Sequence, residues 1–359
     1  MKVTTSSKHH HIRARLEEVI RRGDYTAGEQ LPAEQDLAVR YGVSYGTVRR
    51  AISDLVAAEM LERRARKGTF VRQGVHDKLT KTTINLITSV YEGATQSAFI
   101  WHGAQAAARR GWIANIIRLT RGQQEPAVRV IRNGELTLVY LDEIRHSSAL
   151  GIAMKAARGK AVSICQDLTA IEVPSVLNPP AMEFELAIQR LRAKGHQRIT
   201  IVAQFPESDT APAAFWQRDF DDLFARLDPR PDLIQAKVPL YFVPAEPAYE
   251  AVKAYLSDHP NTTGLITQGP EIAVGALAAC RDLGRAVPDA ISLVTLNDSP
   301  YMRLASPRVT SVDLRFEEQC EVASKILEAT LASRPIGELL HLTTPRLIEG
   351  GSVGPASGD

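Results

Sequence analysis

The hydrophobic pattern divides the chain into two parts. Up to Val71, apolar residues recur at helical spacing. Two sets predict buried helix stripes: Ile12, Leu16, Val19 and Ile20, then Val48, Ile52, Leu55 and Val56. From Ile84 onwards, short apolar runs alternate with amphipathic segments, as in strands that each precede a helix. We therefore expect a small helical unit followed by a larger α/β unit, and no regular structure in residues 1–9.

The small unit reads as two helices joined by a tight turn. Pro32 suits a helix start, and Gly42 suits a left-handed C-cap. Ser44 is placed to cap the next helix. The runs Leu61–Arg64 and Thr69–Arg72 flank a basic turn and predict a β-hairpin. Together these elements predict a winged helix-turn-helix, which is a DNA-binding fold.

The second helix of this pair carries side chains suited to the major groove. Tyr45 and Arg49 lie away from the apolar stripe, with Thr47 and Arg50 beside them. Backbone N–H groups and arginines hold phosphates, and arginine can also bind a guanine edge. The alternative is an ordinary helical hairpin with a solvated charged face. The order and spacing of all the parts favour DNA binding.

The segment from Ile12 to Val71 resembles the DNA-binding domain of GntR-family transcription regulators, through LPAEQDLAVRYGVSYGTVRRAISDL and KGTFV. Two positions depart from the family pattern, because Gln35 and Tyr45 stand where arginine is common. The departures leave the operator sequence open. With the basic residues beside the matched positions, the expected DNA contacts are Gln35, Ser44, Tyr45, Gly46, Thr47, Arg49, Arg50, Arg66, Lys67 and Gly68.

The larger unit predicts parallel sheets covered by helices on both faces, in two lobes. The expected strands are Ile84–Val90, Trp112–Leu119, Leu136–Leu141, Ala161–Cys165, Arg198–Ala203, Leu240–Val243, Gly264–Thr267 and Ser292–Asn297. The expected helices are Phe99–Arg110, Glu125–Asn133, Ala149–Arg158, Met182–Lys194, Ala214–Leu227, Ala248–Ser257 and Ile272–Leu283.

Polar residues recur where these strands end, among them Tyr91, Gln166, Asp167, Gln268 and Asn297. Sheets of this kind bind ligands at the carboxyl ends of their strands. Taken singly, each residue is better explained as a loop residue or helix cap. Their recurrence at the same edge favours a cleft for a polar ligand.

Residues 84–350 resemble the effector domain of LacI-family repressors, which is similar to periplasmic sugar-binding proteins. The blocks LRAKGHQRITIV and AVGALAACRDLGRAVPDAISLVTLNDSPYMRLASPRVTSVDLRF carry the resemblance. The pairing with a GntR-like domain is similar in layout to arabinose repressors. The expected effector contacts are Tyr91, Ser97, Phe99, Gln166, Asp167, Trp216, Tyr241, Gln268, Asn297 and Phe316.

Four residues, at three places in the chain, depart from the LacI pattern at the ligand site. Trp216 replaces the arginine that clamps a ligand, Asn297 replaces an aspartate, and Gly269–Pro270 replaces an Asn-Asp pair. A flat, neutral ligand stacked on aromatic rings fits these changes. The alternatives are that Trp216 is a core residue and that the effector site has decayed.

Charge supports this division of the chain. The first 76 residues hold 14 basic and 9 acidic residues, against 29 and 32 in the remainder. Cys165, Cys280 and Cys320 lack metal-ligand spacing and predict buried, reduced thiols in a cytoplasmic protein. No apolar run is long enough to span a membrane, and the N-terminus is too polar for a signal peptide.

We therefore expect four segments: a winged-helix domain (1–75), a linker (76–83), an effector domain (84–350) and a disordered tail (351–359). We expect no metal or cofactor and no enzyme activity, because hydrolase motifs are missing and no lysine suits a pyridoxal-phosphate domain. The predicted function is a ligand-controlled transcriptional repressor that acts as a homodimer on palindromic double-stranded DNA, with a carbohydrate-like effector.

Overall fold

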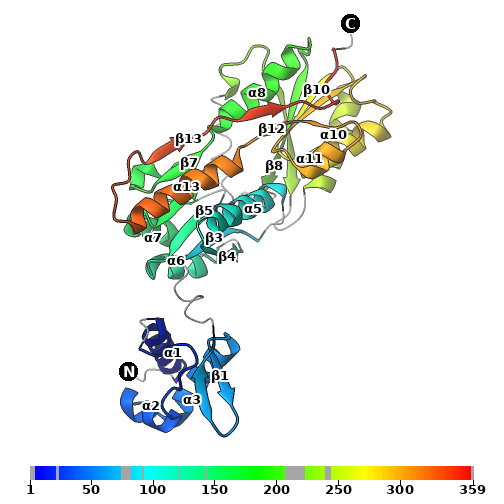
Figure 1. Ribbon diagram of the computed structural model, residues 1–359. Coiled ribbons are helices and arrows are strands. Elements are labelled where there is room, and N and C mark those ends of the chain that lie inside the picture. Colours follow the sequence, from blue (N-terminus) through cyan, green and yellow to red (C-terminus); the bar gives the residue numbers. More distant parts are fainter. Residues whose placement is uncertain are drawn as a thin grey trace. The chain divides into compact units, whose positions relative to one another are not determined.

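The computed structural model describes residues 5–21, 24–73, 82–90, 93–120, 122–141, 144–206, 223–238 and 244–356 (Figure 1). The chain divides into two compact units, Met1–Thr82 and Thr83–Asp359. Each unit has its own hydrophobic core. We describe each unit by itself.

The first unit is a three-helix bundle with a β-hairpin. Its elements are α1 (Thr5–Arg21), α2 (Glu34–Tyr41), α3 (Tyr45–Ala57), β1 (Leu61–Arg64) and β2 (Gly68–Val71). The two predicted stripes meet in one core, although Val19 is half-buried outside it and Val56 lies at its margin. The expectation of no regular structure in residues 1–9 was wrong for residues 5–9, since α1 begins at Thr5 and His9 is buried close to Asp54, while residues 1–4 lie outside the described residues.

Within its described residues, the second unit contains two six-stranded sheets. The first sheet has the order β13-β7-β6-β5-β3-β4 and all its pairings are parallel. Its strands are β3 (Thr83–Ser89), β4 (Ile113–Leu119), β5 (Leu136–Tyr140), β6 (Ala161–Ile164), β7 (Ser175–Leu177) and β13 (Leu340–Leu342). The prediction of a parallel sheet is confirmed for this lobe.

The second sheet has the order β14-β12-β11-β10-β8-β9. Only β14 runs antiparallel to its neighbour. Its strands are β8 (Ile199–Pro206), β9 (Asp232–Val238), β10 (Gly264–Thr267), β11 (Ser292–Leu296), β12 (Thr310–Asp313) and β14 (Arg346–Ile348). The strands β7, β9, β12, β13 and β14 were not predicted.

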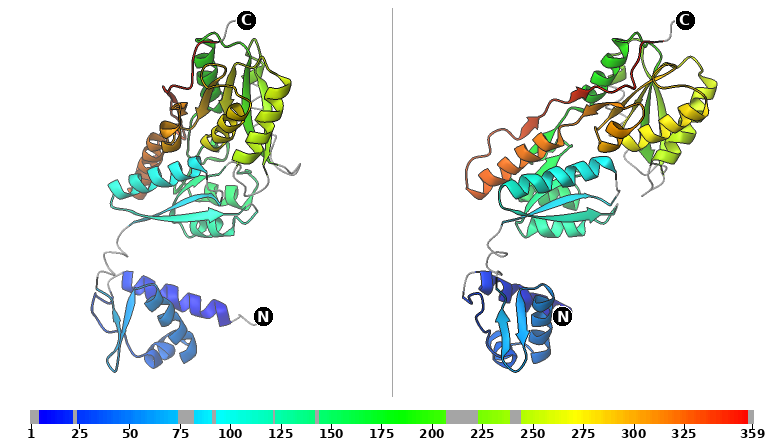
Figure 2. Two further views of the ribbon diagram at one scale, coloured as in Figure 1. Left: turned by 90° about the vertical axis from the view of Figure 1, so that its right-hand side faces the viewer. Right: turned by 45° about the vertical axis from the view of Figure 1, so that its right-hand side comes forward.

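Helices cover both faces of each sheet (Figures 1 and 2). In the first lobe, α5 and α13 pack on one face, and α6 and α7 pack on the other. In the second lobe, α10 and α11 pack on one face and α8 on the opposite one. Two further short helices, η1 and α12, are present in this unit. The bounds of all the helices of the unit are α5 (Ala94–Arg109), α6 (Glu125–Arg132), α7 (Ala149–Ala156), η1 (Thr169–Ile171), α8 (Pro180–Arg192), α10 (Ala245–Asp258), α11 (Pro270–Asp282), α12 (Pro300–Leu304) and α13 (Phe316–Leu331).

The chain passes between the lobes three times: from β7 to α8, from β12 to α13, and from β13 to β14. One buried side chain joins all three crossings. Asn178 Nδ2 donates to the Leu314 carbonyl at 2.7 Å, and Asn178 Oδ1 accepts from the Thr343 hydroxyl. The lobes therefore share a hydrogen-bonded hinge.

The expectation of a disordered tail from residue 351 onwards was wrong for the residues that the structure describes. Ser352 is fully buried, donates to the Leu293 carbonyl at 2.6 Å, and accepts from Thr310 N at 2.8 Å. Ala356 N donates to the Lys194 carbonyl at 2.8 Å. Residues 351–356 are thus part of the second lobe.

Two predicted elements lie wholly or largely outside the described residues, namely the strand Leu240–Val243 and most of the helix Ala214–Leu227. None of the three cysteines forms a disulfide. Cys280 and Cys320 are buried, Cys165 is half-buried, and burial raises the pKa of Cys280 to about 11. Among the described residues, no helix has the length and apolar character needed to cross a membrane.

Candidate functional site

The turn between α2 and α3 forms as the capping residues predict. Gly42 adopts φ 62°, and the cap N–H groups donate to the carbonyls of Ala38 and Val39. Ser44 caps α3 by accepting from Thr47 N at 3.3 Å. These two local signals fix where α3 begins, and so they fix which side chains its first turn exposes.

The first turns of α3 present an exposed surface that contains Tyr45, Gly46, Arg49 and Arg50. Gln35 on α2 is exposed as well. Thr47 behaves differently from the expectation, because it is only 6% exposed and its hydroxyl shares a 2.8 Å hydrogen bond with the Ser44 hydroxyl. Thr47 therefore supports the start of the helix, and we remove it from the proposed direct contacts.

The hairpin β1–β2 carries a cationic tip. Arg64 pairs with Gly68, so Ala65, Arg66 and Lys67 form the loop, and Lys67 N donates to the Arg64 carbonyl at 3.0 Å. Gly68 adopts φ 114°, a conformation that side chains with a Cβ rarely tolerate. A Cβ there would lie 2.5 Å from Gln30 Nε2, the atom that donates to the Lys67 carbonyl at 2.7 Å.

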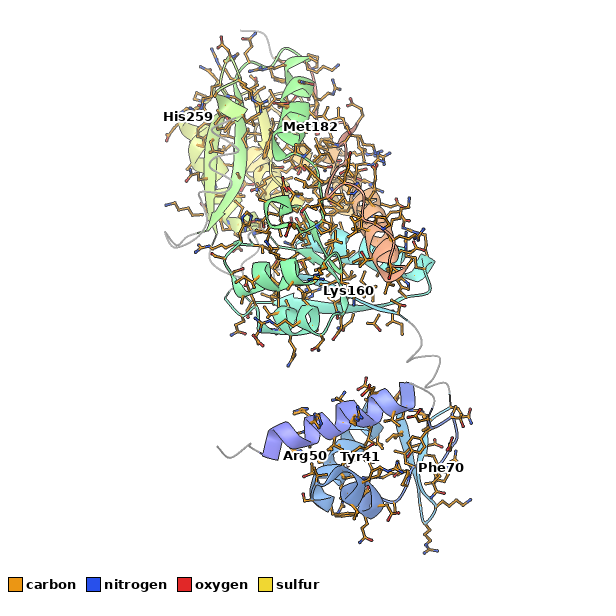
Figure 3. All side chains as sticks on the ribbon, turned by 90° about the vertical axis from the view of Figure 1, so that its left-hand side faces the viewer. Tyr41, Arg50, Phe70, Lys160, Met182 and His259 are labelled. Atoms are coloured by element: carbon orange, nitrogen blue, oxygen red, sulfur yellow. The ribbon has the colours of Figure 1, made fainter. Side chains whose placement is uncertain are left out.

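The basic residues of α3 and of residues 61–72, which contain the hairpin, fall into two groups. Arg63, Arg64 and Arg72 are paired with Glu34, Glu62 and Glu59. In contrast, the exposed cations of α3 and the hairpin tip form no ion pair within the described part of the chain; these are Arg49, Arg50, Arg66 and Lys67. Arg50 is labelled in Figure 3. Cations without a carboxylate partner keep their charge available for an anionic ligand such as a phosphate backbone.

Sequence reasoning missed Glu34, which links the hairpin to α3. Its carboxylate accepts from Arg63 Nη2 at 2.9 Å and also hydrogen-bonds the Tyr45 hydroxyl. The second bond raises the pKa of Tyr45 above its ordinary value. Glu34, Tyr45 and Arg63 lie far apart in sequence, so no local pattern indicates this contact.

The expected effector contacts have different outcomes in the second unit. Tyr91, Trp216 and Tyr241 lie outside the described residues. Ser97 is exposed in the first turn of α5. Asp167 accepts from Thr169 N at 2.9 Å and from its hydroxyl at 2.7 Å, as in a local turn. None of these positions is joined to the others by a hydrogen bond among the described residues.

Phe99 and Phe316 are core residues. They are 0% and 6% exposed, and both pack against the Tyr140 ring, with ring centroids at 5.3 Å and 5.4 Å. This burial contradicts the expectation that they contact an effector, and we withdraw both. The three rings instead hold α5 and α13 on the first sheet.

Gln166 and Gln268 also serve the fold. Gln166 is 7% exposed, donates to the Ile144 carbonyl at 3.0 Å and accepts from Ile144 N at 2.7 Å. Both ends of this amide are therefore occupied. Gln268 Oε1 accepts from Gln204 N at 2.8 Å, which joins β8 to the end of β10.

Asn297 is the expected contact that the structure brings to the facing edges of the two lobes. Its Nδ2 donates to Thr95 Oγ1 at 2.9 Å, from the end of β11 to the first turn of α5. Beside it, Glu271 of α11 accepts from Ala94 N at 2.5 Å. Glu271 was missed, although it follows directly after the Gly269–Pro270 departure. These bonds define the candidate effector site as the junction of α5, α11 and β11.

A half-buried glutamate, Glu183, lies near the hinge. Burial raises the pKa of Glu183, in the first turn of α8, to about 8, and a hydrogen bond with Asn178 opposes that shift. Among the described residues, no group of His, Cys, Asp or Glu side chains has the geometry of a metal site. The candidate effector site at the junction of α5, α11 and β11 therefore offers hydrogen-bonding groups and one carboxylate, that of Glu271, which joins the two lobes.

Comparisons with known proteins match both units. Residues 8–71 match bacterial regulatory proteins of the gntR family, and residues 188–353 match a periplasmic binding protein-like domain. A probable fructoselysine utilization operon transcriptional repressor of Escherichia coli (strain K12) is 51% identical over 61 residues, 17% of this chain and 25% of that protein. The chain thus spans about a quarter of that relative's length.

Other likenesses cover most of the chain. The HTH-type transcriptional regulator MalR of Streptomyces coelicolor is 22% identical over 341 residues, 90% of this chain and 97% of that protein. A solved LacI family transcriptional regulator from Arthrobacter sp. FB24 has a TM-score of 0.64 at 20% identity, covering 78% of this chain and 100% of the other. The chain therefore joins an N-terminal segment that matches the gntR family of bacterial regulatory proteins to a segment that matches a periplasmic binding protein-like domain, and its second unit has the fold of solved LacI-family regulators.

Proposed function

We propose that this chain is a transcriptional regulator, acting as a repressor, whose first unit binds operator DNA and whose second unit binds a small effector. One observation carries the proposal: Arg49 and Arg50 on α3 and Arg66 and Lys67 on the hairpin tip are exposed and unpaired within the described residues. Unpaired cations on a helix and a wing suit the major groove and the phosphates beside it.

Selection of DNA from a random library by the full chain tests this proposal directly. The selected sites should be palindromic, because a two-fold dimer binds two equal half-sites. If Arg49 reads a base, Arg49→Ala should cost about 1–3 kcal/mol at one position of each half-site. Arg281→Ala, an exposed position in the second unit, is the control. Equal loss on operator and random DNA would assign Arg49 to a phosphate.

The effector is proposed to be a sugar or sugar derivative. A solved LacI family regulator with this fold, at 20% identity, is a complex with lactose, and the names of two other relatives refer to the ribose operon and GalR. In this chain, Asn297 and the buried Gln96, whose Oε1 has no partner within the described residues, offer polar groups near the start of α5. A thermal-shift screen of the full chain against sugars, sugar acids and nucleosides tests the class, since a ligand at 100 times its Kd stabilises by about 2.7 kcal/mol.

A second candidate is a DNA-binding protein whose effector site has decayed or takes a ligand other than a sugar. It is favoured by one observation: the expected contacts Gln166, Phe99 and Phe316 are all committed to packing or to backbone hydrogen bonds. This candidate would be supported if the full chain binds DNA and no ligand in the screen stabilises it against thermal unfolding.

The regulator is proposed to act as a homodimer formed through the second unit. The strand β4 is at the edge of its sheet, with Ile113 and Ile116 exposed, and Trp101 on α5 is 63% exposed. An exposed apolar edge strand invites pairing, and a second copy of the chain would cover it. Sedimentation should show a dimer that Ile116→Lys weakens and Ile152→Lys, on α7, does not.

Effector binding is proposed to change the angle between the lobes and thereby the spacing of the two α3 helices in the dimer. Coupling of about 1–3 kcal/mol would change operator affinity roughly 5- to 150-fold. The direction of that change is read from operator titrations with and without the effector found in the screen.

A further inference from the structure

The start of α5 is capped by a side chain from the other lobe. The N-cap residue of α5, Gly93, has no side chain to accept a hydrogen bond, and Ala94 N instead donates to Glu271 Oε1 at 2.5 Å. The neighbouring bond from Asn297 Nδ2 to Thr95 Oγ1, at 2.9 Å, joins the same two lobes. A carboxylate of the second lobe therefore occupies the amino end of a helix in the first.

Glu271 is also in the first turn of its own helix, α11. The amino end of a helix carries partial positive charge and exposed N–H groups, which attract anions. One negative side chain thus serves the ends of a 16-residue and a 13-residue helix. Within the described residues, no lysine or arginine forms an ion pair with Glu271, so its charge is balanced by these helix ends.

We infer that Glu271 sets the charge of the effector: it holds the position that a phosphate or carboxylate group would otherwise take, so the site accepts an uncharged ligand and rejects sugar phosphates and sugar acids. An anion that approaches the start of α5 meets a like charge and finds Ala94 N already bonded. This inference rests on the proposed effector binding and narrows the class of ligand.

The substitution Glu271→Gln tests the charge without removing the contact. The amide oxygen of glutamine still accepts from Ala94 N, whereas the negative charge is lost. Glu338→Gln is the matched control, because Glu338 is exposed and forms no ion pair among the described residues. Equal thermal unfolding of the three full-length proteins would establish that differences in binding are not differences in folding.

The first measurement uses sulfate as the probe, and titration calorimetry measures its binding to each full-length protein. This measurement uses Glu271→Ala, which removes the carboxylate and frees Ala94 N. We expect Glu271→Ala to bind one more sulfate per chain than the wild type or Glu338→Gln. Sulfate held by the cations of the first unit is common to all three and cancels in the comparison. Equal sulfate binding by these three proteins would overturn the inference, whether the site binds sulfate in every protein or in none.

The second measurement pairs neutral sugars with their charged forms: glucose with glucose 6-phosphate, galactose with galacturonate, and ribose with ribose 5-phosphate. For any pair that binds, the wild type should prefer the neutral member at least tenfold, and Glu271→Gln should reduce that preference. A wild type that prefers the anionic member contradicts the inference. If no sugar binds, the proposed effector class fails, while the sulfate comparison still decides the role of Glu271.

Discussion

Arg63, in the first strand of the wing, donates a hydrogen bond from Nη2 to Glu34 Oε1 at 2.9 Å. Glu34 begins α2, and its carboxylate also bonds the hydroxyl of Tyr45, the first residue of α3. A negative charge therefore stands among the cations of the proposed DNA-binding surface. It withholds Arg63 from solvent anions and fixes the orientation of Tyr45.

The substitution Glu34→Gln should strengthen DNA binding that is independent of sequence. It removes a negative charge near the phosphates and releases Arg63, so one further phosphate contact becomes available. Each such contact steepens the plot of log K against log salt concentration by about 0.9. Anisotropy titrations on random DNA at several salt concentrations measure that slope. An unchanged slope would mean that Arg63 remains unavailable, and Glu62→Gln, which frees Arg64 alone, gives the comparison.

Much of the first unit could be predicted because its signals are local. Gly42, Ser44 and the apolar stripe of α3 each act within one or two turns, and all three occur as expected. The strand Leu61–Arg64 has the predicted bounds, and the second hairpin strand begins one residue early, at Gly68. Capping and periodicity are properties of the nearby chain, so the sequence contains them.

The start of α5 shows why other features could not be predicted. The expected helix began at Phe99, whereas α5 begins at Ala94, because its capping group is Glu271, 177 residues away. No local pattern reports such a cap. The same holds for the hinge, where Asn178 contacts Leu314 and Thr343, which are 136 and 165 residues away in the sequence.

Helical periodicity is enough to place two of the expected effector contacts, Phe99 and Phe316, in the core. Phe99 is followed by the small buried residues Gly103, Ala106 and Ala107, at four, seven and eight positions, which is the spacing of a buried helix stripe. Phe316 likewise heads a stripe that continues through Cys320. A resemblance to a family assigns a contact by its position in the motif and does not indicate which face of a helix carries the residue. Periodicity places both rings in the core.

Removing the Asn178 side chain at the hinge should weaken the coupling between effector binding and operator affinity. Asn178→Ala leaves the buried Thr343 hydroxyl without its partner, which should lower the free energy of unfolding by about 1–3 kcal/mol. The three crossings would then move independently, so an effector should change operator affinity less than in the wild type. Urea unfolding measures the first effect and operator titration the second.

Asn178→Asp is the discriminating companion variant. Its carboxylate still accepts from Thr343 but repels the Leu314 carbonyl, to which Asn178 donates at 2.7 Å. We expect reduced coupling in this variant as well. Full coupling in both variants would show that the hinge does not depend on this side chain.

Acid should weaken the contact between α5 and α13. The side-chain hydrogen bond from Arg110, with the further bond from Arg109, lowers the pKa of Glu321 to about 2, against an ordinary value of 4.5. Because the folded-state pKa is the lower one, the stabilisation is complete above pH 4.5 and is lost as the pH falls from about 4.5 to about 2. This loss of stability with falling pH is the direction expected of a carboxylate that is paired in the folded state.

Glu321→Gln should therefore reduce the free energy of unfolding by about 1–3 kcal/mol at pH 7. The difference from the wild type should shrink below pH 4.5. Urea unfolding of the second unit at pH 7, 5, 4 and 3 follows this change, with Glu338→Gln as the control. A difference that stays constant over this range would mean that the loss comes from packing and not from charge.

Gly46 offers a test in which stability and DNA binding should change in opposite directions. It is the second residue of α3, and a Cβ built there meets no atom within 4 Å. Alanine should therefore stabilise the helix by about 0.5–1 kcal/mol. If the backbone of α3 approaches DNA at this position, the same methyl group must reduce operator affinity.

Gly68→Ala separates this effect from a general cost of replacing glycine. At φ 114° and with Gln30 Nε2 only 2.5 Å from the new Cβ, alanine should destabilise the first unit and displace the hairpin tip. Thermal unfolding and operator titration of both variants give four results. A more stable Gly46→Ala protein that binds DNA less tightly assigns this face of α3 to the DNA interface. A more stable protein with full affinity moves the contact away from the helix start, because no atom of the described residues lies within 4 Å of the new Cβ.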